Sequence, residues 1–280
     1  MWIFNQILTR LFDVLFWPFQ WLHPWWAMIY ISLLTGLFML WVFRLTSNQA
    51  GIKDIKRRIK AHLLEIRLFK DNFALTFKAQ GNILLCNLKY IGYSFKPMLV
   101  MIVPLVLIII QLNFRFAYLP LTPGQRAIFK VKVQPDLDLL ELPISLTTTS
   151  GIVVETPPLR IEEEGEIDWR IKALEPGRQS LFIQIGDNHQ PISKEIYIAP
   201  DNTRRLTKLS PLRPPAKFPN ALLYPLEKPL PTGTPLREIE ITYPSGHFHL
   251  WGLSIHWLIV YFLLAIAFGF GLKRFVGVEI

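Results

Sequence analysis

Cysteine is almost absent from this chain of 280 residues, because Cys86 is the only one. A single cysteine excludes a disulfide framework, so any domain that folds outside the cytoplasm must be held together by a hydrophobic core. Cys86 itself lies in an apolar run with Ile83, Leu84 and Leu88. We therefore interpret it as a small, buried hydrophobic residue.

Motifs of the common enzyme classes are also missing. The chain has no phosphate-binding loop, no dinucleotide fingerprint and no nucleophile elbow. His247 and His249 are its closest histidine pair, but no further metal donor lies near them in the sequence. The acidic run Glu162–Glu164 lacks the alternating oxygen spacing of a calcium loop. We expect no enzyme, no cofactor and no metal site, and a membrane enzyme is the weakest alternative.

Long apolar stretches are what the chain has in abundance, with 51% hydrophobic and 13% aromatic residues. Three of them, Trp25–Phe43, Pro97–Leu112 and Trp251–Leu272, approach the roughly 20 residues that cross a bilayer. Tryptophans at the interface extend the spans at their ends, namely Trp25, Trp26, Trp251 and Trp257. The sequence therefore predicts an α-helical membrane protein with three transmembrane helices, at residues 25–45, 97–113 and 250–272.

The charge distribution predicts how these spans are oriented. Between Arg44 and Lys96 there are 11 Lys or Arg residues and 3 Asp or Glu residues, whereas Phe114–His247 carries 16 of each. Loops rich in Lys and Arg stay on the cytoplasmic side. We expect an integral protein of the cytoplasmic (inner) membrane of a prokaryote, with the N-terminus outside and the basic loop and the tail, 273–280, inside. Orientation in the lipid bilayer explains the excess of Lys and Arg over Asp and Glu, so we expect no specific nucleic-acid partner.

The first 24 residues (1–24) resemble a signal peptide in hydrophobicity, but they have no basic start and no small-residue cleavage site. At about 100° per residue their polar side chains fall within an arc of about 140°. We interpret this segment as an amphipathic helix at the membrane interface, which Pro18 and Pro24 end. The alternative is a helix buried against the other spans. The polar residues are Asn5, Gln6, Thr9, Arg10, Asp13 and Gln20.

The cytoplasmic loop, 46–96, is predicted to form a basic helical hairpin. Gln49–Phe69 has apolar residues at a spacing of three and four, with basic residues between them. A break at Asp71–Asn72 precedes a second helical segment at about Phe73–Gly92. We expect the hairpin to lie partly on the membrane surface. The basic residues of interest are Lys53, Lys56, Arg57, Arg58, Lys60 and Arg67.

Residues 126–200 change to the pattern of a β domain. Ala127–Gln134 alternates apolar and polar residues, and turn signals recur about every ten residues. We expect an inserted extracytoplasmic sandwich of the immunoglobulin-like type, with Ile171, Leu181, Ile183 and Ile196 fully buried. The other expected strands are Ile144–Thr149, Ile152–Glu155, Ile167–Leu174, Gln179–Ile185, Ile192–Ala199 and Leu236–Tyr243. The Pro-rich connector, 201–247, is either a stiff spacer or a belt wrapped on the sandwich.

Polar residues cluster at the ends of the predicted spans. Arg44, Asn48 and Gln49 follow the first span, while Gln111, Asn113 and Arg115 end the second. Polar groups that face the interior of a helix bundle can form a wet groove for a passing polar segment. A different interpretation of Arg44 and Arg115 is snorkelling to the interface, and Asn48 and Gln49 can equally be a helix cap.

The order of these parts resembles the YidC/Oxa/Alb superfamily of membrane-protein insertases, and most of all its reduced three-span members, which are similar to the third subunit of the endoplasmic-reticulum membrane protein complex. The segments that carry the resemblance are IKDIKRRIKAHLLEIRLFKDNF in the hairpin and FKPMLVMIVPLVLIIIQL in the second span. In the latter, Pro97-Met98-Leu99 and Pro104 match the Pro-Met-Leu…Pro entry to the span after the hairpin. The resemblance covers about Trp25–Leu112 and Trp251–Arg274.

The resemblance implies an insertase-like protein that assists insertion or assembly of membrane proteins through a hydrophilic groove open to lipid. Its partners would be nascent or unassembled membrane proteins, and Arg44 approximately matches the family's positive groove residue. The alternative is a membrane-anchored binding or scaffold protein, in which the immunoglobulin-like domain binds an extracytoplasmic partner and the spans are only anchors.

Overall fold

The computed structural model describes residues 2–186, 190–200, 206–250 and 252–279, and it divides the chain into two compact units. The β unit comprises Met1–Ala27 and Ile110–Trp257, and the helical unit comprises Met28–Ile109 and Leu258–Ile280. The division cuts three long helices, α2 after Ala27, α4 after Ile109 and α6 after its first residue, Trp257. Each unit is described by itself.

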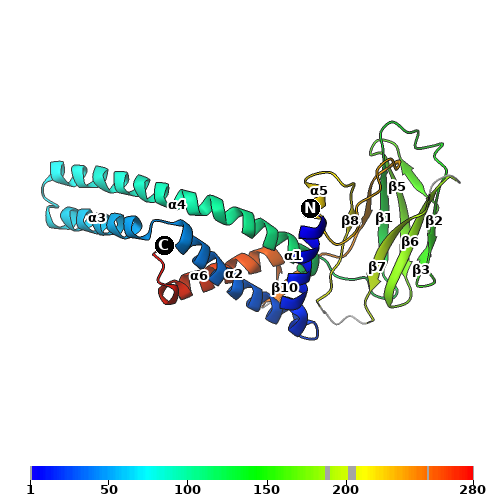
Figure 1. Cartoon of the computed structure of the whole chain (residues 1–280), viewed down its shortest axis with the longest axis horizontal. Coiled ribbons are helices and arrows are strands. Elements are labelled where there is room, and N and C mark those ends of the chain that lie inside the picture. The colour runs from blue at the N-terminus through cyan, green and yellow to red at the C-terminus, as the bar shows by residue number, and fades with distance from the viewer. Residues whose placement is uncertain (1, 187–189, 201–205, 251, 280) are drawn as a thin grey trace. The chain divides into compact units, whose positions relative to one another are not determined.

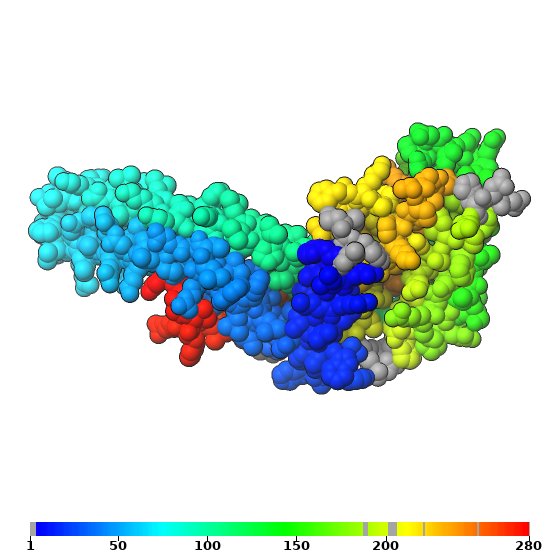
Figure 2. Space-filling model, in the orientation of Figure 1, coloured from blue at the N-terminus to red at the C-terminus, as the bar shows by residue number. Residues whose placement is uncertain are grey.

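Three helices are long and apolar enough to cross a membrane, which confirms that part of the predicted fold class. They are α2 (Pro24–Thr46), α4 (Phe73–Phe116) and α6 (Trp257–Val276). A fourth helix, α3 (Gln49–Leu68), is the amphipathic arm predicted in the basic loop. Figures 1 and 2 show α3 and the first part of α4 side by side as a hairpin.

Helix α4 corrects the prediction of a separate hairpin arm and second span. Its 44 residues form one helix that passes through Pro97 and Pro104 (Figure 1). Each proline lacks an N–H, so the carbonyls of Tyr93 and Val100 lose their usual helical donor. Only these isolated bonds are lost, and the flanking residues continue the helix, as is common in apolar helices.

The start of the third predicted span is also corrected, because a small hairpin precedes the helix. Strands β10 (His247–Leu250) and β11 (Leu253–His256) pair antiparallel, and Gly252 in the turn has a positive φ of 82°. Such a turn favours glycine, which has no Cβ. Helix α6 therefore begins at Trp257, and His256 precedes the helix and does not lie inside it. Trp251, a predicted anchor, lies outside the described residues.

Helices α2 and α6 approach each other closely at a glycine. A Cβ on Gly36 would lie 3.1 Å from the carbonyl oxygen of Ala265 and 3.2 Å from the backbone nitrogen of Gly269. Small residues at a helix–helix contact permit this closeness and strengthen van der Waals packing. The helical unit therefore has a tight contact on this side.

The β unit contains antiparallel sheets, as predicted. The more specific immunoglobulin-like topology stays a prediction. A six-stranded sheet has the order β3-β5-β1-β9-β8, with β4 paired to β5, and a three-stranded sheet has the order β2-β6-β7. All seven predicted strands are present, and β4 and β8 were not predicted. The strands are β1 (Arg126–Val133), β2 (Ile144–Thr148), β3 (Ile152–Val154), β4 (Leu159–Ile161), β5 (Glu166–Ala173), β6 (Gly177–Ile185), β7 (Ile192–Ile198), β8 (Leu212–Arg213) and β9 (Leu236–Ile241).

One hydrophobic core joins the two larger sheets, and the Pro-rich connector belongs to it. The four residues predicted to be fully buried are all in this core. Leu209, Leu230 and Tyr243 from the connector are buried in the same cluster, and β8 pairs with β9. The connector was predicted to be either a stiff spacer or a belt, and its described part is a belt packed on the sheets. It also includes the short helix α5 (Asn220–Leu223).

Candidate functional site

The helical unit contains a cavity of about 540 Å³ lined by residues of α2, α4 and α6. Apolar side chains dominate its wall, with methionines from two of the helices, and none of the described lining residues is charged. Methionine is flexible and polarisable, so it adapts to occupants of different shape. The cavity is therefore suited to an apolar occupant. Residues that represent the three helices are Thr35, Met39, Phe43, Ser94, Met98, Met101, Tyr261 and Gly269.

Two hydroxyl groups in this wall are chemically unusual. That of Ser94 is buried and makes no hydrogen bond to any described residue. That of Tyr261 is also buried, and the side chain of Thr35 is its hydrogen-bonding neighbour. Leaving a buried hydroxyl without a partner costs about 1–3 kcal/mol. The Ser94 hydroxyl therefore has unused hydrogen-bonding capacity in the wall of the cavity.

The predicted groove residues of the helical unit lie at the ends of the helices. The guanidinium of Arg44 donates a hydrogen bond to the carbonyl oxygen of Val276 at 3.0 Å, at the end of α6. Asn48 is the N-cap of α3, and its side chain accepts from the N–H of Gly51 at 3.0 Å. Cations near a helix C-terminus and Asn at an N-cap both stabilise helix ends. The cap interpretation of Asn48 is thus confirmed.

Gln49 and the tail connect the start of α3 to the end of α6. Gln49 donates to the hydroxyl of Ser47 and accepts from the backbone N–H of Glu279 at 2.8 Å. The ammonium of Lys56 lies 3.3 Å from the Glu279 carboxylate. Of the predicted basic residues, Lys56 is half-buried in this contact, while Arg58 pairs with Asp54 at 3.0 Å. The remaining four, Lys53, Arg57, Lys60 and Arg67, are exposed.

The other two predicted groove residues belong to the β unit. Gln111 is buried, and its side chain donates to the hydroxyl of Thr9 at 3.2 Å. Asn113 is half-buried and bonds to the side chain of Tyr118. Burial raises the pKa of Tyr118, and the bond from Asn113 opposes that shift. Both amides therefore have partners within their own unit.

Arg115, which was predicted to end the second span or to snorkel to the interface, is the centre of a buried polar cluster. Its side chain is 2% exposed, and its guanidinium lies 2.7 Å from the Asp13 carboxylate. It also donates to the carbonyl of Gln111 at 2.8 Å and stacks over the ring of Phe16 at 5.3 Å. Asp13 bonds a second cation, Lys208, at 2.8 Å. A single carboxylate thus holds the N-terminal helix to both the end of α4 and the connector.

Helix α1 (Trp2–Phe16), followed by η1 (Trp17–Phe19), presents its polar stripe inward in part. Asn5 is buried, as are the rings of Phe12 and Phe16. The outward face of α1 is mostly apolar, because Phe4, Ile7, Leu11 and Val14 are exposed. This arrangement suits a helix that contacts lipid with its outer face while its polar groups bond to protein.

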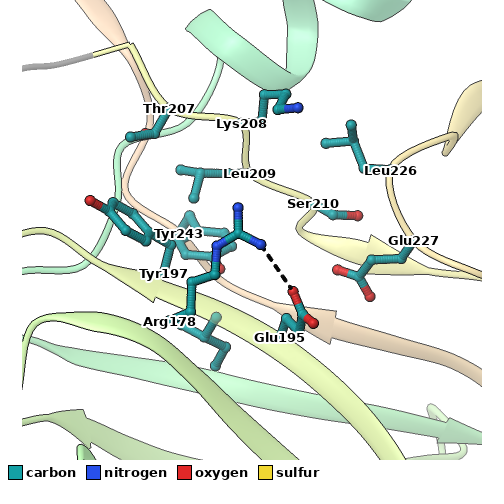
Figure 3. Close-up of a pocket in the computed structure, with 11 residues that line it drawn as sticks. Arg178, Glu195, Tyr197, Thr207, Lys208, Leu209, Ser210, Leu226, Glu227 and Tyr243 are labelled. Carbon is teal, nitrogen blue, oxygen red and sulfur yellow. Dashed lines mark ion pairs between the residues drawn. The ribbon is translucent and has the colours of Figure 1, made fainter. Parts of the chain in front are cut away.

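A second cavity, of about 330 Å³, lies in the β unit beside strand β7. Figure 3 shows the segment Thr207–Ser210 on one side of it, and on the other Arg178 and Glu195, whose charged atoms are 3.9 Å apart. Glu227 and Tyr243 complete the wall. Charges of both signs and two tyrosines make this cavity much more polar than that of the helical unit.

Behind this polar cavity lies a fully buried lysine. The ammonium of Lys194 lies 2.6 Å from the Glu227 carboxylate and donates to the carbonyl of Ser210 at 2.7 Å. Burial lowers the pKa of Lys194, and the charge of Glu227 opposes that shift. Since β7 is the outer strand of its sheet, the pair joins the sheet edge to the belt.

The cavity of the helical unit was not among the sites predicted from the sequence. The signal was present as a face of α4, where Tyr90, Ser94, Met98, Met101 and Leu105 recur at steps of three and four residues. Among the residues that the structure describes, no three His, Cys, Asp or Glu side chains are grouped so that they could hold a metal ion.

Comparisons with known proteins give little beyond this geometry. No family model matches the chain, and no curated protein matches it. Among solved structures, domains 4 and 5 of the S-layer protein SbsC align over 30% of this chain and 47% of theirs, with 14% identity and a TM-score of 0.23. A longer SbsC structure, rSbsC(31-844), aligns over 50% of this chain and 22% of its own, with 10% identity and a TM-score of 0.23. The chain thus spans less than half of either neighbour.

Proposed function

We propose that this protein is an insertase-like integral membrane protein that assists the insertion or assembly of other membrane proteins. In this proposal α2, α4 and α6 span the cytoplasmic membrane, the basic hairpin faces the cytoplasm, and the β unit, as an immunoglobulin-like sandwich, lies outside. The length and composition of the three helices support the spans, and the basic loop supports the orientation.

The observation that carries the proposal is the uncharged cavity among the three helices. Its volume of about 540 Å³ is sufficient for several side chains of an apolar segment. The hydroxyl of Ser94 offers a partner to a polar group of that segment. An unpaired polar group in hydrocarbon costs several kcal/mol, so such partners lower the cost of the crossing.

Site-specific photo-crosslinking to short membrane-protein chains stalled on ribosomes tests the proposal. Probes at Met98 and Met101 are expected to crosslink to the stalled chains, because both side chains line the cavity. A probe at Val103, which is exposed about 120–180° around the helix from them, serves as the control. Equal crosslinking from all three positions, or none from the cavity, would contradict the proposal.

A matched glycine pair tests whether the cavity volume matters. Gly269 lines the cavity and Gly271 does not, and a Cβ on either meets nothing within 4 Å. Gly269→Phe should therefore place a large side chain at the cavity wall and abolish the crosslinks, whereas Gly271→Phe should leave them intact. Arg44→Ala tests the family-based expectation separately, since it should impair only substrates with acidic outside flanks.

The polar cavity beside β7 favours a second candidate, a membrane-anchored binding or scaffold protein. Its charged and aromatic wall is suited to a polar ligand outside the membrane. In that case full-length protein with Gly269→Phe would keep its function, while a large side chain at Thr207 would remove it. The two candidates therefore predict opposite results for the two variants.

A further inference from the structure

An exposed apolar stripe runs along the hairpin part of α4. Its six side chains recur at steps of four, seven, four, three and four residues, and at about 100° per residue they fall within an arc of about 60°. Their exposed fraction falls only from 77% at the first to 53% at the last. The residues are Phe73, Phe77, Leu84, Leu88, Ile91 and Phe95.

Helix α3 packs on the other side of α4 and does not cover this stripe. The buried residues Ala79 and Cys86 lie about 150–170° around the helix from the middle of the stripe. The ring of Tyr93, on that same far side, lies against Gly51 of α3. The stripe is therefore not part of the interface within the hairpin.

A flat bilayer cannot account for the whole stripe. The apolar span of α4 begins after Lys96, and α4 is one continuous helix. At about 1.5 Å per residue, Phe73 lies ~33 Å along the helix axis from Phe95. Only the end of the stripe near Phe95 is therefore close to the proposed membrane.

The charges beside the stripe indicate what kind of surface complements it. Helix α4 contains no Asp or Glu, and Lys78, Lys89 and Lys96 form a row about 110–135° around the helix from the middle of the stripe. The hairpin from Gln49 to Lys96 has ten Lys or Arg residues and three Asp or Glu residues. A second copy of this chain would place lysines opposite lysines, whereas a helix with acidic residues would pair with them.

We propose that this stripe, Phe73–Phe95 on α4, is the docking surface for an amphipathic helix of a partner protein that carries a row of acidic residues beside its apolar seam. Steps of three and four residues are the spacing at which two helices pack along a seam. Gly81 and Gly92 lie beside the stripe with open space above them, so a partner helix can approach closely. Ile91 and Phe95, at one end of the stripe, also line the cavity of the helical unit, whereas Phe73, Phe77, Leu84 and Leu88 do not, so the docking is tested on the latter part.

The test uses the full chain in nanodiscs of zwitterionic lipid and three fluorescein-labelled helical peptides. The acidic probe has leucines at the spacing of the stripe and glutamates along one flank. The basic probe has lysines in place of the glutamates, and the shuffled probe has the composition of the acidic probe without an apolar face. Fluorescence anisotropy should show that the acidic probe binds at least tenfold more tightly than the other two, and not to empty nanodiscs.

Variants of exposed residues identify the surface without disturbing the fold. Leu84→Ser with Leu88→Ser should lower the affinity for the acidic probe at least tenfold. Leu64→Ser with Leu68→Ser, on the far face of α3, should leave that affinity unchanged. Lys78→Glu with Lys89→Glu should reverse the preference to the basic probe. The matched control, Lys53→Glu with Arg57→Glu on α3, should keep the preference for the acidic probe.

Several outcomes would overturn the proposal. Equal binding of the acidic and shuffled probes would mean that the stripe is a general hydrophobic surface. Quenching of a fluorophore at Phe73 by brominated lipids would mean that the bilayer covers the stripe. If the unchanged chain formed a dimer and the variant with Leu84→Ser and Leu88→Ser did not, a second copy of the chain would be the occupant.

Discussion

The β unit and the helical unit treat buried polar groups in opposite ways. In the β unit, the buried ammonium of Lys194 meets Glu227 and the buried guanidinium of Arg115 meets Asp13. In the helical unit, the buried hydroxyl of Ser94 makes no hydrogen bond to a described residue. The first unit pairs these two buried cations internally, although one carboxylate oxygen of Asp168 is buried without a hydrogen-bond partner among the described residues. The second unit leaves hydrogen-bonding capacity in the wall of a cavity.

This difference indicates which unit is stable without a further partner. A core whose charges are paired needs no further partner to be stable. An unpaired hydroxyl and an exposed apolar stripe have a cost that contact with lipid, a client segment or another helix can offset. We therefore expect substitutions to affect folding in the β unit and interactions in the helical unit.

The largest effect is expected from Glu227→Gln in the β unit. It leaves the fully buried charge of Lys194 without its counter-charge, which typically costs about 3–5 kcal/mol. Hydrogen exchange of the β6 and β7 amides should show this loss of stability. The control is Glu195→Gln, whose side chain is 66% exposed and loosely paired to Arg178, so its effect should stay below about 1 kcal/mol. Equal effects of the two changes would disprove the distinction.

A smaller, local effect is expected from Asp13→Ala. The change removes the carboxylate shared by Arg115 and Lys208, and a hydrogen bond to a charged group contributes about 1.5–3 kcal/mol. Limited proteolysis should cut within α1 faster, while strands β1 and β5 keep their exchange protection. Asp136→Ala, an exposed carboxylate in a turn, provides the control and should leave cleavage of α1 unchanged.

In the helical unit, Gly36→Val tests packing without touching a polar group. The added side chain would press on the backbone of α6 near Ala265 and Gly269, and such overpacking costs about 1–3 kcal/mol. The thermal midpoint of the detergent-solubilised protein should fall. Gly271→Val meets open space and should not lower it. An unchanged midpoint for Gly36→Val would mean that α2 and α6 separate easily.

The smallest effect on stability, and the sharpest contrast between the units, comes from two serines. Ser94→Ala removes a hydroxyl without a partner, so stability should stay constant or rise by less than about 1 kcal/mol. Ser210→Ala removes a hydroxyl that donates to the carbonyl of Leu212 at 3.1 Å, so stability should fall by about 0.5–1.5 kcal/mol. Denaturant titrations of both variants measure the contrast, and a loss at Ser94 would show that its hydroxyl is bonded after all.

Local pattern was sufficient for the strands and for most of the core. Alternation along Arg126–Val133 and Ile192–Ile198 places apolar residues on one face, because successive side chains of a strand point to opposite sides. The same rule places Lys194 on the buried face of β7, where a lysine is unexpected. Its partner, Glu227, lies 33 residues away in the connector, and no local pattern predicts such a pair.

The predicted groove residues show the corresponding limit for the site. Arg44, Asn48 and Gln49 were chosen because they are polar and close to the end of a span, but helix ends need caps and cation partners for their own stability. The cavity wall includes Ser94 and Tyr261, whose sequence neighbours are apolar or aromatic. Which face of each helix meets the others depends on packing between distant segments, and the sequence pattern does not determine it.

The register of the six-stranded sheet sets the order in which the β unit can form during synthesis. Strand β1 lies between β5 and β9, with Phe129 opposite Ile241, so one of its two edges stays open until more than a hundred further residues have been made. Pairing over such sequence distances is slow and exposes strand edges to aggregation. A chain interrupted before Leu236 would therefore leave one edge of β1 without its partner strand, and that edge would be open to pairing with other chains.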